Sequence, residues 1–266
     1  CRAVNMVHKG LLGEIKKVTA GINGSPIGGP FPIENPPAGL DWNLWCGPAP
    51  LVPFNKKMHP KGFRKFLDYA NGTLGDWGIH WMDQILWWTD EKFPRMVGST
   101  GGRHLLEDNT DAPDTQVVNF EFESFTATWE HRTYAANNAE KHNIGCYFYG
   151  TEGTMHVGWL DGWNFYPRGK NAEPIHMDPE LHLPDQQNIP ELWADFVACI
   201  KNGNTPACDI EVGHRSTNMS LLGMLSLRLG RSVRWDGESE VILDDPEANK
   251  LLKREYRDPW KYPDYA

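Results

Sequence analysis

Short runs in which apolar and polar residues alternate fill the middle of the chain, and they constrain the fold more than any other feature. They cover residues 116–123, 125–134, 144–149 and 153–158. Alternation with a period of two is typical of strands that bury one face. The connection at 151–153, Thr-Glu-Gly, is so short that the last two runs are predicted to form a hairpin.

Helical patterns are grouped mainly after these strands. Apolar residues recur at helical spacing over 75–88, 190–201 and 209–230, and a further helix is predicted from Pro246. In the helix over 209–230, the apolar residues from Leu221 to Leu229 are expected to pack inward. Additional strands are predicted at 14–20, 232–235 and 240–243. Because strands run in series with helices grouped beside them, the sequence predicts an α+β fold in which helices cover a sheet.

The first 60 residues have a different character. Residues 1–12 are typical of the end of a helix, with apolar side chains at Ala3, Val4 and Val7 and a stop at Gly10. Because the chain begins at Cys1 rather than Met, we expect it to be part of a longer protein whose N-terminus lies upstream. Residues 24–60 are dense in Gly and Pro and are predicted to form a long irregular excursion. Such loops are usually functional.

Composition narrows the function classes. Among 266 residues, 26 Lys and Arg stand against 35 Asp and Glu, for a net charge of -9. Such a surface repels phosphate backbones, so we expect no nucleic-acid partner. No apolar run reaches the roughly 18–20 residues that cross a bilayer, so we expect no membrane partner. Five Cys without a Cys-x-x-Cys pair suggest neither a disulfide scaffold nor a zinc ribbon.

The chain contains no glycine-rich motif that would hold a nucleotide. Neither Gly-x-Gly-x-x-Gly after a strand nor Gly-x-x-x-x-Gly-Lys-Ser/Thr occurs, and residues 98–102 (GSTGG) are predicted to form only a turn. A dinucleotide therefore has no evident cradle within these residues.

The strongest chemical signal is the segment 72–83, GTLGDWGIHWMD. Asp76, His80 and Asp83 are spaced so that a helix would place them on one face. A carboxylate one turn from a histidine fixes its tautomer and raises its basicity, which suits a general base. We therefore interpret His80 as a base oriented by Asp76. Gly75 and Gly78 are expected to let a flat ring or sugar approach the backbone.

Two other interpretations of this segment stay open. Asp76 fits the N-cap of a helix, a purely structural role. Asp76, His80 and Asp83 also form a possible set of three metal ligands, as in a metal-dependent hydrolase. We favour acid–base chemistry and predict no metal, because no other His or Cys cluster stands at metal-ligand spacing.

The stretch GTLGDWGIHWMDQILWW resembles a helix of the glucose–fructose oxidoreductase/inositol dehydrogenase (Gfo/Idh/MocA) family. The segments GLLGEIKKV, GTEGTMHV, GHRSTNMSLLGMLSLRLGRSVRWD and DDPEANKLLKREYRDPW agree with it in the same order. The resemblance covers nearly all of residues 1–266, but only the second, C-terminal domain of that family. It implies a large, mostly antiparallel open sheet with helices packed on one face.

The resemblance also implies an activity and a division of labour. In such enzymes an N-terminal Rossmann domain, here expected upstream of Cys1, binds NAD or NADP. Its Glu-Lys-Pro lysine joins an Asp and a His of the second domain, and these match Asp76 and His80. Because that lysine and the dinucleotide motif have no counterpart here, the chain alone is expected to be inactive. The implied reaction is hydride transfer from a sugar, cyclitol or related polyol to nicotinamide, with His80 as base.

Four further residues are candidates for substrate binding. The resemblance implies a pocket position for His59, which is otherwise a loop histidine. The guanidinium of Arg64 suits a carboxylate or a pair of hydroxyls, although the interpretation that we favour for it is a surface ion pair. Asp83 is either a supporting partner in the site or a helix-surface residue. Tyr134 stands at a predicted strand end, where a sugar could stack.

Alternative functions remain at this point. One is a glycosidase-like enzyme that oxidises its sugar transiently with NAD. Another is a non-enzymatic module for carbohydrate binding or oligomerisation. We also expect a homodimer or homotetramer formed through the sheet face, and a cytoplasmic location, with an exported form as the alternative.

Overall fold

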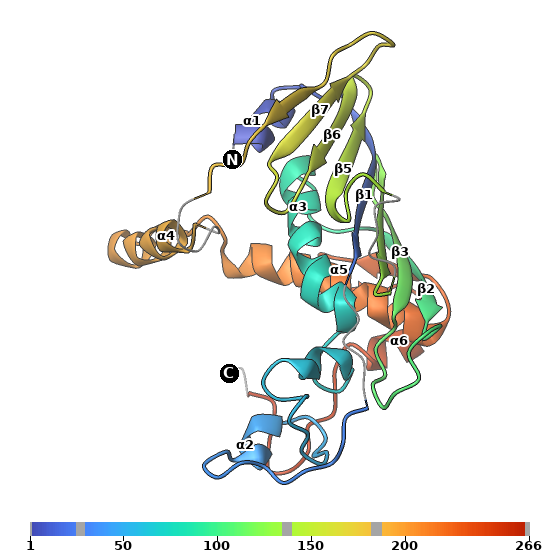
Figure 1. Ribbon diagram of the computed structural model, residues 1–266, viewed down its shortest axis with the longest axis vertical. Coiled ribbons are helices and arrows are strands. Elements are labelled where there is room, and N and C mark those ends of the chain that lie inside the picture. Colours follow the sequence, from blue (N-terminus) through green and yellow to red (C-terminus); the bar gives the residue numbers. More distant parts are fainter. Residues whose placement is uncertain (1, 25–29, 135–139, 182–187, 264–266) are drawn as a thin grey trace.

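A single mixed sheet forms the centre of the computed structural model, which describes residues 2–24, 30–134, 140–181 and 188–263. Its strand order is β10-β9-β2-β3-β4-β1-β5-β6-β7-β8 (Figure 1). The strands are β1 (Ile15–Asn23), β2 (Met96–Gly102), β3 (Thr115–Glu121), β4 (Thr126–Arg132), β5 (Ile144–Gly150), β6 (Gly153–Val157), β7 (Trp163–Pro167), β8 (Ile175–Met177), β9 (Val233–Asp236) and β10 (Val241–Ile242).

The first strand lies in the middle of this sheet. β1 pairs in parallel with β4, with Val18 opposite Ala127, and antiparallel with β5. Every other strand pair in the described residues is antiparallel. The predicted hairpin between β5 and β6 is present, so the mostly antiparallel α+β architecture is confirmed.

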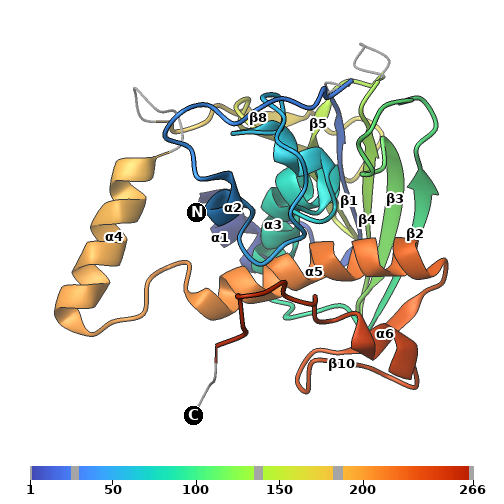
Figure 2. The same cartoon turned by 90° about the horizontal axis from the view of Figure 1, so that it is seen from below.

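Helices cover one face of the sheet, and Figure 2 shows the other face without them. The helices are α1 (Arg2–His8), α2 (Trp42–Cys46), the 3₁₀-helix η1 (Gly62–Lys65), the π-helix η2 (Leu74–Gly78), α3 (Ile79–Thr89), α4 (Ile189–Asn202), α5 (Ile210–Leu229) and α6 (Pro246–Lys250). The core lies between the sheet and helices α1, α3 and α5, where Val18 and Phe148 belong to the same buried cluster as Ile85 and Met219.

The turn predicted at residues 98–102 is wrong, because these residues belong to β2, which pairs with β3 along its whole length. Glycine is needed there for close approach: Gly101 has φ 145°, and a Cβ would lie 2.2 Å from the Thr115 carbonyl oxygen. Strands are predicted from apolar and polar side chains in alternation, and a strand that is rich in glycine lacks this pattern. Strands β7 and β8 were also missed by the sequence analysis.

The helix predicted over 75–88 begins as the π-helix η2 and continues as α3. Its glycines face the protein rather than a ligand. A Cβ on Gly78 would lie 2.9 Å from the Leu74 side chain and 3.5 Å from the Trp129 ring, and one on Gly75 would lie 2.6 Å from Asn71. The expectation that these glycines admit a flat ring is therefore wrong; they let η2 approach the sheet and the preceding turn.

Helix α4 stands away from the sheet at the side of the molecule (Figures 1 and 2). Its apolar residues Leu192, Trp193, Phe196, Val197 and Ile200 are exposed, Trp193 to 61%. In α5, Leu221 is exposed to 45%, so the expectation that it packs inward is wrong; Leu222 and Leu225 face the core instead.

Among the described helices, none combines the length and apolar character needed to cross a membrane.

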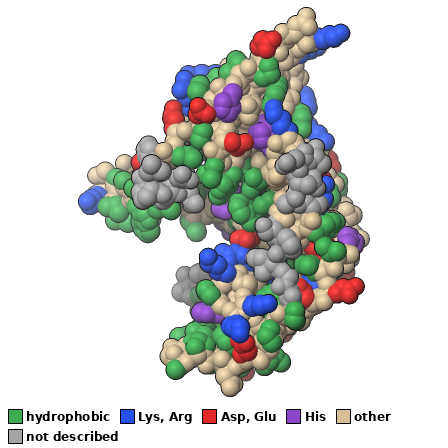
Figure 3. All heavy atoms as spheres, in the orientation of Figure 1, with side chains coloured by type: hydrophobic (Ala, Val, Ile, Leu, Met, Phe, Trp, Pro, Cys, Tyr) green, Lys and Arg blue, Asp and Glu red, His purple; other side chains and the backbone are tan. Residues whose placement is uncertain are grey.

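The described part of the 24–60 excursion is irregular apart from α2, and it forms a small lobe with its own buried cluster. Trp42, Cys46, Phe54 and Met58 are the buried members. The C-terminal segment ties this lobe down, because Arg257 donates hydrogen bonds to the carbonyl oxygens of Ala49 and Asn43. Figure 3 shows that the surface is hollowed between this lobe and the side of the molecule that carries α4.

Candidate functional site

Asp76 is held by an arginine of η1, the short helix that follows the small lobe. It lies in η2, and its Oδ1 accepts a hydrogen bond of 2.8 Å from Nε of Arg64 in η1. Arg64 also donates to the Lys61 carbonyl oxygen. Both side chains of the ion pair are about one third exposed. Asp76 is therefore not an N-cap, and the ion-pair interpretation of Arg64 is confirmed.

A buried lysine lies next to this pair, and the sequence analysis missed it. Lys65 is 7% exposed, and its Nζ donates a hydrogen bond of 3.0 Å to the Thr73 hydroxyl. Burial lowers the pKa of Lys65, an effect partly offset by the carboxylates of Asp76, Asp114 and Asp108. The sequence does not predict the burial of Lys65, because the segment HPKGFRKF contains several cationic residues and no pattern that distinguishes a buried one.

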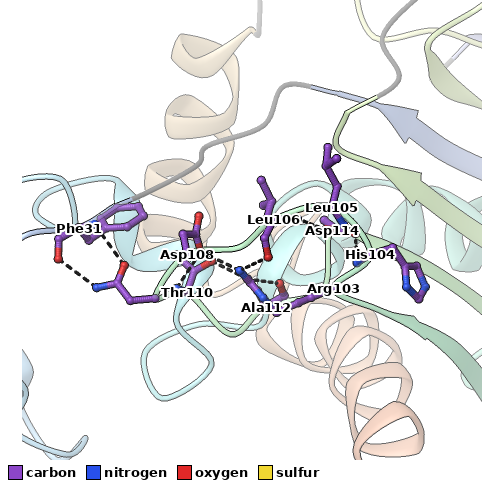
Figure 4. Close-up of polar contacts among 10 residues, drawn as sticks. Phe31, Arg103, His104, Leu105, Leu106, Asp108, Thr110, Ala112 and Asp114 are labelled. Atoms are coloured by element: carbon purple, nitrogen blue, oxygen red, sulfur yellow. Dashed lines mark hydrogen bonds and ion pairs between the residues drawn. The ribbon is translucent and has the colours of Figure 1, made fainter.

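The loop between β2 and β3 carries Asp114 (Figure 4), and the carboxylate of Asp114 acts on that lysine. The carboxylate of Asp114 accepts hydrogen bonds from the backbone N–H groups of His104, Leu105 and Leu106. Burial alone would raise the pKa of Asp114, but these donors and the Thr115 hydroxyl lower it to about 2. Asp114 is therefore a fixed negative charge.

The same loop is closed by Arg103 (Figure 4) and is attached to the small lobe by Asn109. Arg103 binds the Asp108 carboxylate and the Thr110 hydroxyl. Asn109 exchanges two hydrogen bonds with the backbone of Phe31. The loop thus connects the ends of β2 and β3 to the residues that surround Arg64 and Lys65.

His80 lies in the first turn of α3 and is exposed. Two indole rings flank its imidazole: the ring centroid of Trp159 lies 5.0 Å away and that of Trp77 lies 6.2 Å away. Within the described residues, no hydrogen bond joins His80 to Asp76, whose carboxylate is taken by Arg64. The imidazole is therefore accessible and laterally fixed by aromatic contacts.

A cavity of about 490 Å³ opens beside His80. Asp83, Trp159, Cys208 and Ser216 also line it. The Ser216 hydroxyl donates a hydrogen bond of 2.9 Å to Asp83 Oδ1, which joins α3 to α5. Desolvation and the neighbouring carboxylates of Asp83 and Asp209 raise the pKa of Cys208, so its thiol stays protonated.

The structure does not gather all of the predicted substrate-binding residues at this cavity. His59 lies in the small lobe, with its ring 5.6 Å from that of Trp45. Tyr134 lies beyond the end of β4, where its hydroxyl is 3.1 Å from the Thr115 hydroxyl. Of the six candidates, only His80 and Asp83 line the cavity, while Asp76 and Arg64 form the adjacent ion pair.

Asp76, His80 and Asp83 do not form a metal-ligand set in the structure. Among the described residues, only one group of three His, Cys, Asp or Glu side chains brings its ligand atoms within 4.8 Å of one another, and it lies elsewhere. The hydrolase hypothesis based on these three residues therefore has no geometric support.

Two neighbouring cations allow a matched test of burial. We expect Lys65→Ala to lower the unfolding free energy by roughly 2 kcal/mol or more, because it removes a buried cation from among three carboxylates. Arg64→Ala should cost less than about 1 kcal/mol, because exposed ion pairs contribute little. Urea unfolding of both variants measures the difference, and equal losses would contradict it.

Comparison with known proteins identifies the domain. The family model described as "Oxidoreductase family, C-terminal alpha/beta domain" matches residues 29–262. No curated protein sequence matches the chain.

Solved structures share the fold. An oxidoreductase domain protein from Kribbella flavida has a TM-score of 0.63 at 16% identity, over 88% of this chain and 61% of that chain. An aldose-aldose oxidoreductase from Caulobacter crescentus, complexed with glycerol, has a TM-score of 0.60 at 17% identity, over 87% of this chain and 59% of that one. The WlbA dehydrogenase from Bordetella pertussis, in complex with NADH and UDP-GlcNAcA, has a TM-score of 0.58 at 16% identity, over 88% and 59%.

The chain thus spans about three fifths of the length of these structures. At such low identities the likeness shows the fold, while the family model, which covers most of the chain, shows the relationship. The resemblance seen in the sequence is therefore confirmed, and the chain belongs to the Gfo/Idh/MocA oxidoreductase family, of which it contains the C-terminal α/β domain.

Proposed function

We propose that this domain supplies the substrate site and the proton acceptor of an NAD(P)-dependent oxidoreductase that acts on a sugar, cyclitol or related polyol. The observation that carries the proposal is the exposed imidazole of His80, set between Trp77 and Trp159 at the wall of a cavity of about 490 Å³. Its volume lies in the range that is typical of small-molecule sites, roughly 300–1,000 Å³, and is sufficient for a hydroxyl-bearing ring.

The side chains around the cavity suit this chemistry. When bound, the nicotinamide accepts the hydride that leaves the carbinol carbon. His80 takes the hydroxyl proton, because a neutral imidazole is an effective base at neutral pH. Trp159 offers an apolar face for the sugar ring. The carboxylate of Asp83, fixed by Ser216, can accept a hydrogen bond from a second hydroxyl.

The neighbouring ion pair has a positioning role in this proposal. Arg64 holds the carboxylate of Asp76 one helical turn before His80. The negative charge of Asp76 then favours the imidazolium that forms as the proton is transferred. The guanidinium of Arg64, paired with that carboxylate, limits the pull of Asp76 on the histidine.

The dinucleotide requires a further domain in this proposal. The chain has no glycine-rich phosphate-binding motif, while its exposed His80 and the apolar side chains of α4 present a surface that a second domain could cover. We propose that a Rossmann domain precedes this chain in the complete protein and brings NAD or NADP to the hollow seen in Figure 3.

The test is a turnover assay with the complete protein. We expect a sugar or polyol from a panel of hexoses, inositols and sugar acids to form NAD(P)H and one equivalent of oxidised product. Turnover without net NAD(P)H would instead indicate transient oxidation, as in a glycosidase-like reaction. Sugar binding that neither needs nor changes with NAD(P)H would contradict the proposal and leave a carbohydrate-binding module.

A further inference from the structure

Two histidines and an aspartate meet on the sheet face opposite the helices. His156 lies in β6 opposite Tyr147, His142 precedes β5, and Asp161 lies in the loop between β6 and β7. One ligand atom from each of the three lies within 4.8 Å of the other two. Nδ1 of His142 is 3.3 Å from a carboxylate oxygen of Asp161, and the two imidazole rings stack with centroids 3.7 Å apart.

The nitrogens of these histidines are not explained by the protein alone. His156 is fully buried, yet neither ring nitrogen has a hydrogen-bond partner among the described residues. Nε2 of His142 is also buried without such a partner. Buried polar atoms are nearly always satisfied, because leaving one unpaired costs free energy. Three such atoms in one cluster therefore indicate a missing ligand.

The backbone around the cluster makes room for the buried ring. Gly145 lies beside His156, and a Cβ at that position would be 2.4 Å from the His156 Nε2 atom. Gly158 likewise lies under Asp161, whose carboxylate occupies the space that a side chain at 158 would fill. Both glycines let the ligand side chains approach the strands closely.

We propose that His142, His156 and Asp161 bind one divalent transition-metal ion of the zinc type. Two imidazoles and a carboxylate are the ligands that Zn²⁺ takes in three-residue protein sites. Zinc–ligand distances are about 2.0–2.2 Å, so ligand atoms within 4.8 Å of one another need only a small adjustment to converge. The exposed side of Asp161 leaves space for a water molecule as a further ligand.

The electrostatic surroundings are compatible with a cation. Burial lowers the pKa of His156 to about 4, so this ring is neutral and can coordinate a metal at neutral pH. The ammonium group of Lys141, whose charge acts on His156, donates a hydrogen bond of 2.8 Å to the hydroxyl of Tyr166. The Asp161 carboxylate supplies negative charge at the cluster itself.

An ion at this position would also fix a segment of the candidate functional site. The loop 158–162 carries Asp161 on the outer side and Trp159 on the side of the cavity, where its ring contacts His80. A metal bound to Asp161 therefore restrains the loop that holds Trp159. The metal site itself does not rest on the proposed oxidoreductase activity.

The experiment is a metal titration of the chelator-treated protein. We expect one Co²⁺ per chain to produce visible ligand-field absorption, and one Zn²⁺ to abolish it by displacement. Zn²⁺ should also raise the apparent unfolding temperature in a concentration-dependent way, because it binds the folded state. Absence of a one-to-one complex with either ion would overturn the proposal.

Variants separate this cluster from the other histidines. His142→Ala and Asp161→Asn each change a side chain at the surface of the cluster, and each should weaken Co²⁺ binding at least roughly tenfold. His176→Ala is the matched control, because His176 forms a similar exposed pair with Asp178 outside the cluster. Binding that is unchanged in both cluster variants, or that is lost in the control, would overturn the assignment.

Discussion

Replacing His80 by alanine in the complete oxidoreductase is expected to lower kcat by about 100- to 10,000-fold, the usual contribution of a general base. The loss follows from the proposed role: without the imidazole, the hydroxyl proton must pass to water while the hydride leaves. KM should change less, because Trp159 and Asp83 still line the cavity. Steady-state kinetics at saturating dinucleotide measures both parameters.

Stability distinguishes this loss of catalysis from a loss of folding. His80 is exposed, and within the described part of the chain its imidazole makes ring contacts but no hydrogen bond, so His80→Ala should change the unfolding free energy by no more than about 0.5 kcal/mol. His59→Ala is the matched control, since His59 also contacts a tryptophan ring but lies in the small lobe. If kcat of His80→Ala stays at the wild-type value, His80 is not the base.

Local patterns predicted the parts of the fold in which the side chains themselves carry the signal. The alternating runs at β3 to β6 and the short connection before Gly153 identified the strands and their hairpin. Strand β2 was not predicted, because its glycines are required by the close approach of the β3 backbone. That requirement comes from another strand and leaves no pattern in the sequence of β2 itself. The exposure of Leu221 likewise depends on what faces α5, which helical periodicity cannot specify.

The candidate site was predictable only where its residues are neighbours in sequence. Asp76, His80 and Asp83 lie in one helical segment, and their spacing drew attention to them. Lys65 could not be singled out, because its burial depends on the β2–β3 loop, whose backbone packs against it more than forty residues further along the chain. The His142, His156 and Asp161 cluster was missed for the same reason: strand pairing brings these residues together.

Acid is expected to destabilise the domain in steps, and a buried histidine accounts for the first. His131 in β4 is fully buried; its Nδ1 accepts a hydrogen bond from the Trp129 indole, and Nε2 lies 3.2 Å from the Pro113 carbonyl oxygen. Only a neutral ring with its proton on Nε2 satisfies both partners. Burial, assisted by the positive charge of Lys65 and opposed by Asp114 and the Pro113 carbonyl, lowers the pKa of His131 to about 4.

The sign of the effect follows from the two pKa values. The unfolded chain takes up the His131 proton near its ordinary pKa of about 6.5, whereas the folded chain does so only near 4. The unfolded state therefore binds more protons between these values, and stability falls as the pH decreases through this window. The difference corresponds to roughly 3 kcal/mol from His131. His156 has a similarly lowered pKa and titrates in the same range.

Urea unfolding in the presence of a chelator, at about pH 7 and about pH 4.5, measures this loss. His131→Gln should be less stable than wild type at pH 7 but should lose less stability on acidification, because the titrating group is gone. Asp114→Asn is the matched control: the pKa of Asp114 is about 2, so its contribution disappears only below its unfolded pKa of about 3.9. If His131→Gln and wild type lose equal stability between the two pH values, His131 is not the buried neutral group that the hydrogen bonds of β4 require. If instead the loss is smaller in His131→Gln than in wild type and Asp114→Asn, His131 contributes to the first acid step, and the Asp114 carboxylate keeps its charge until more acidic conditions.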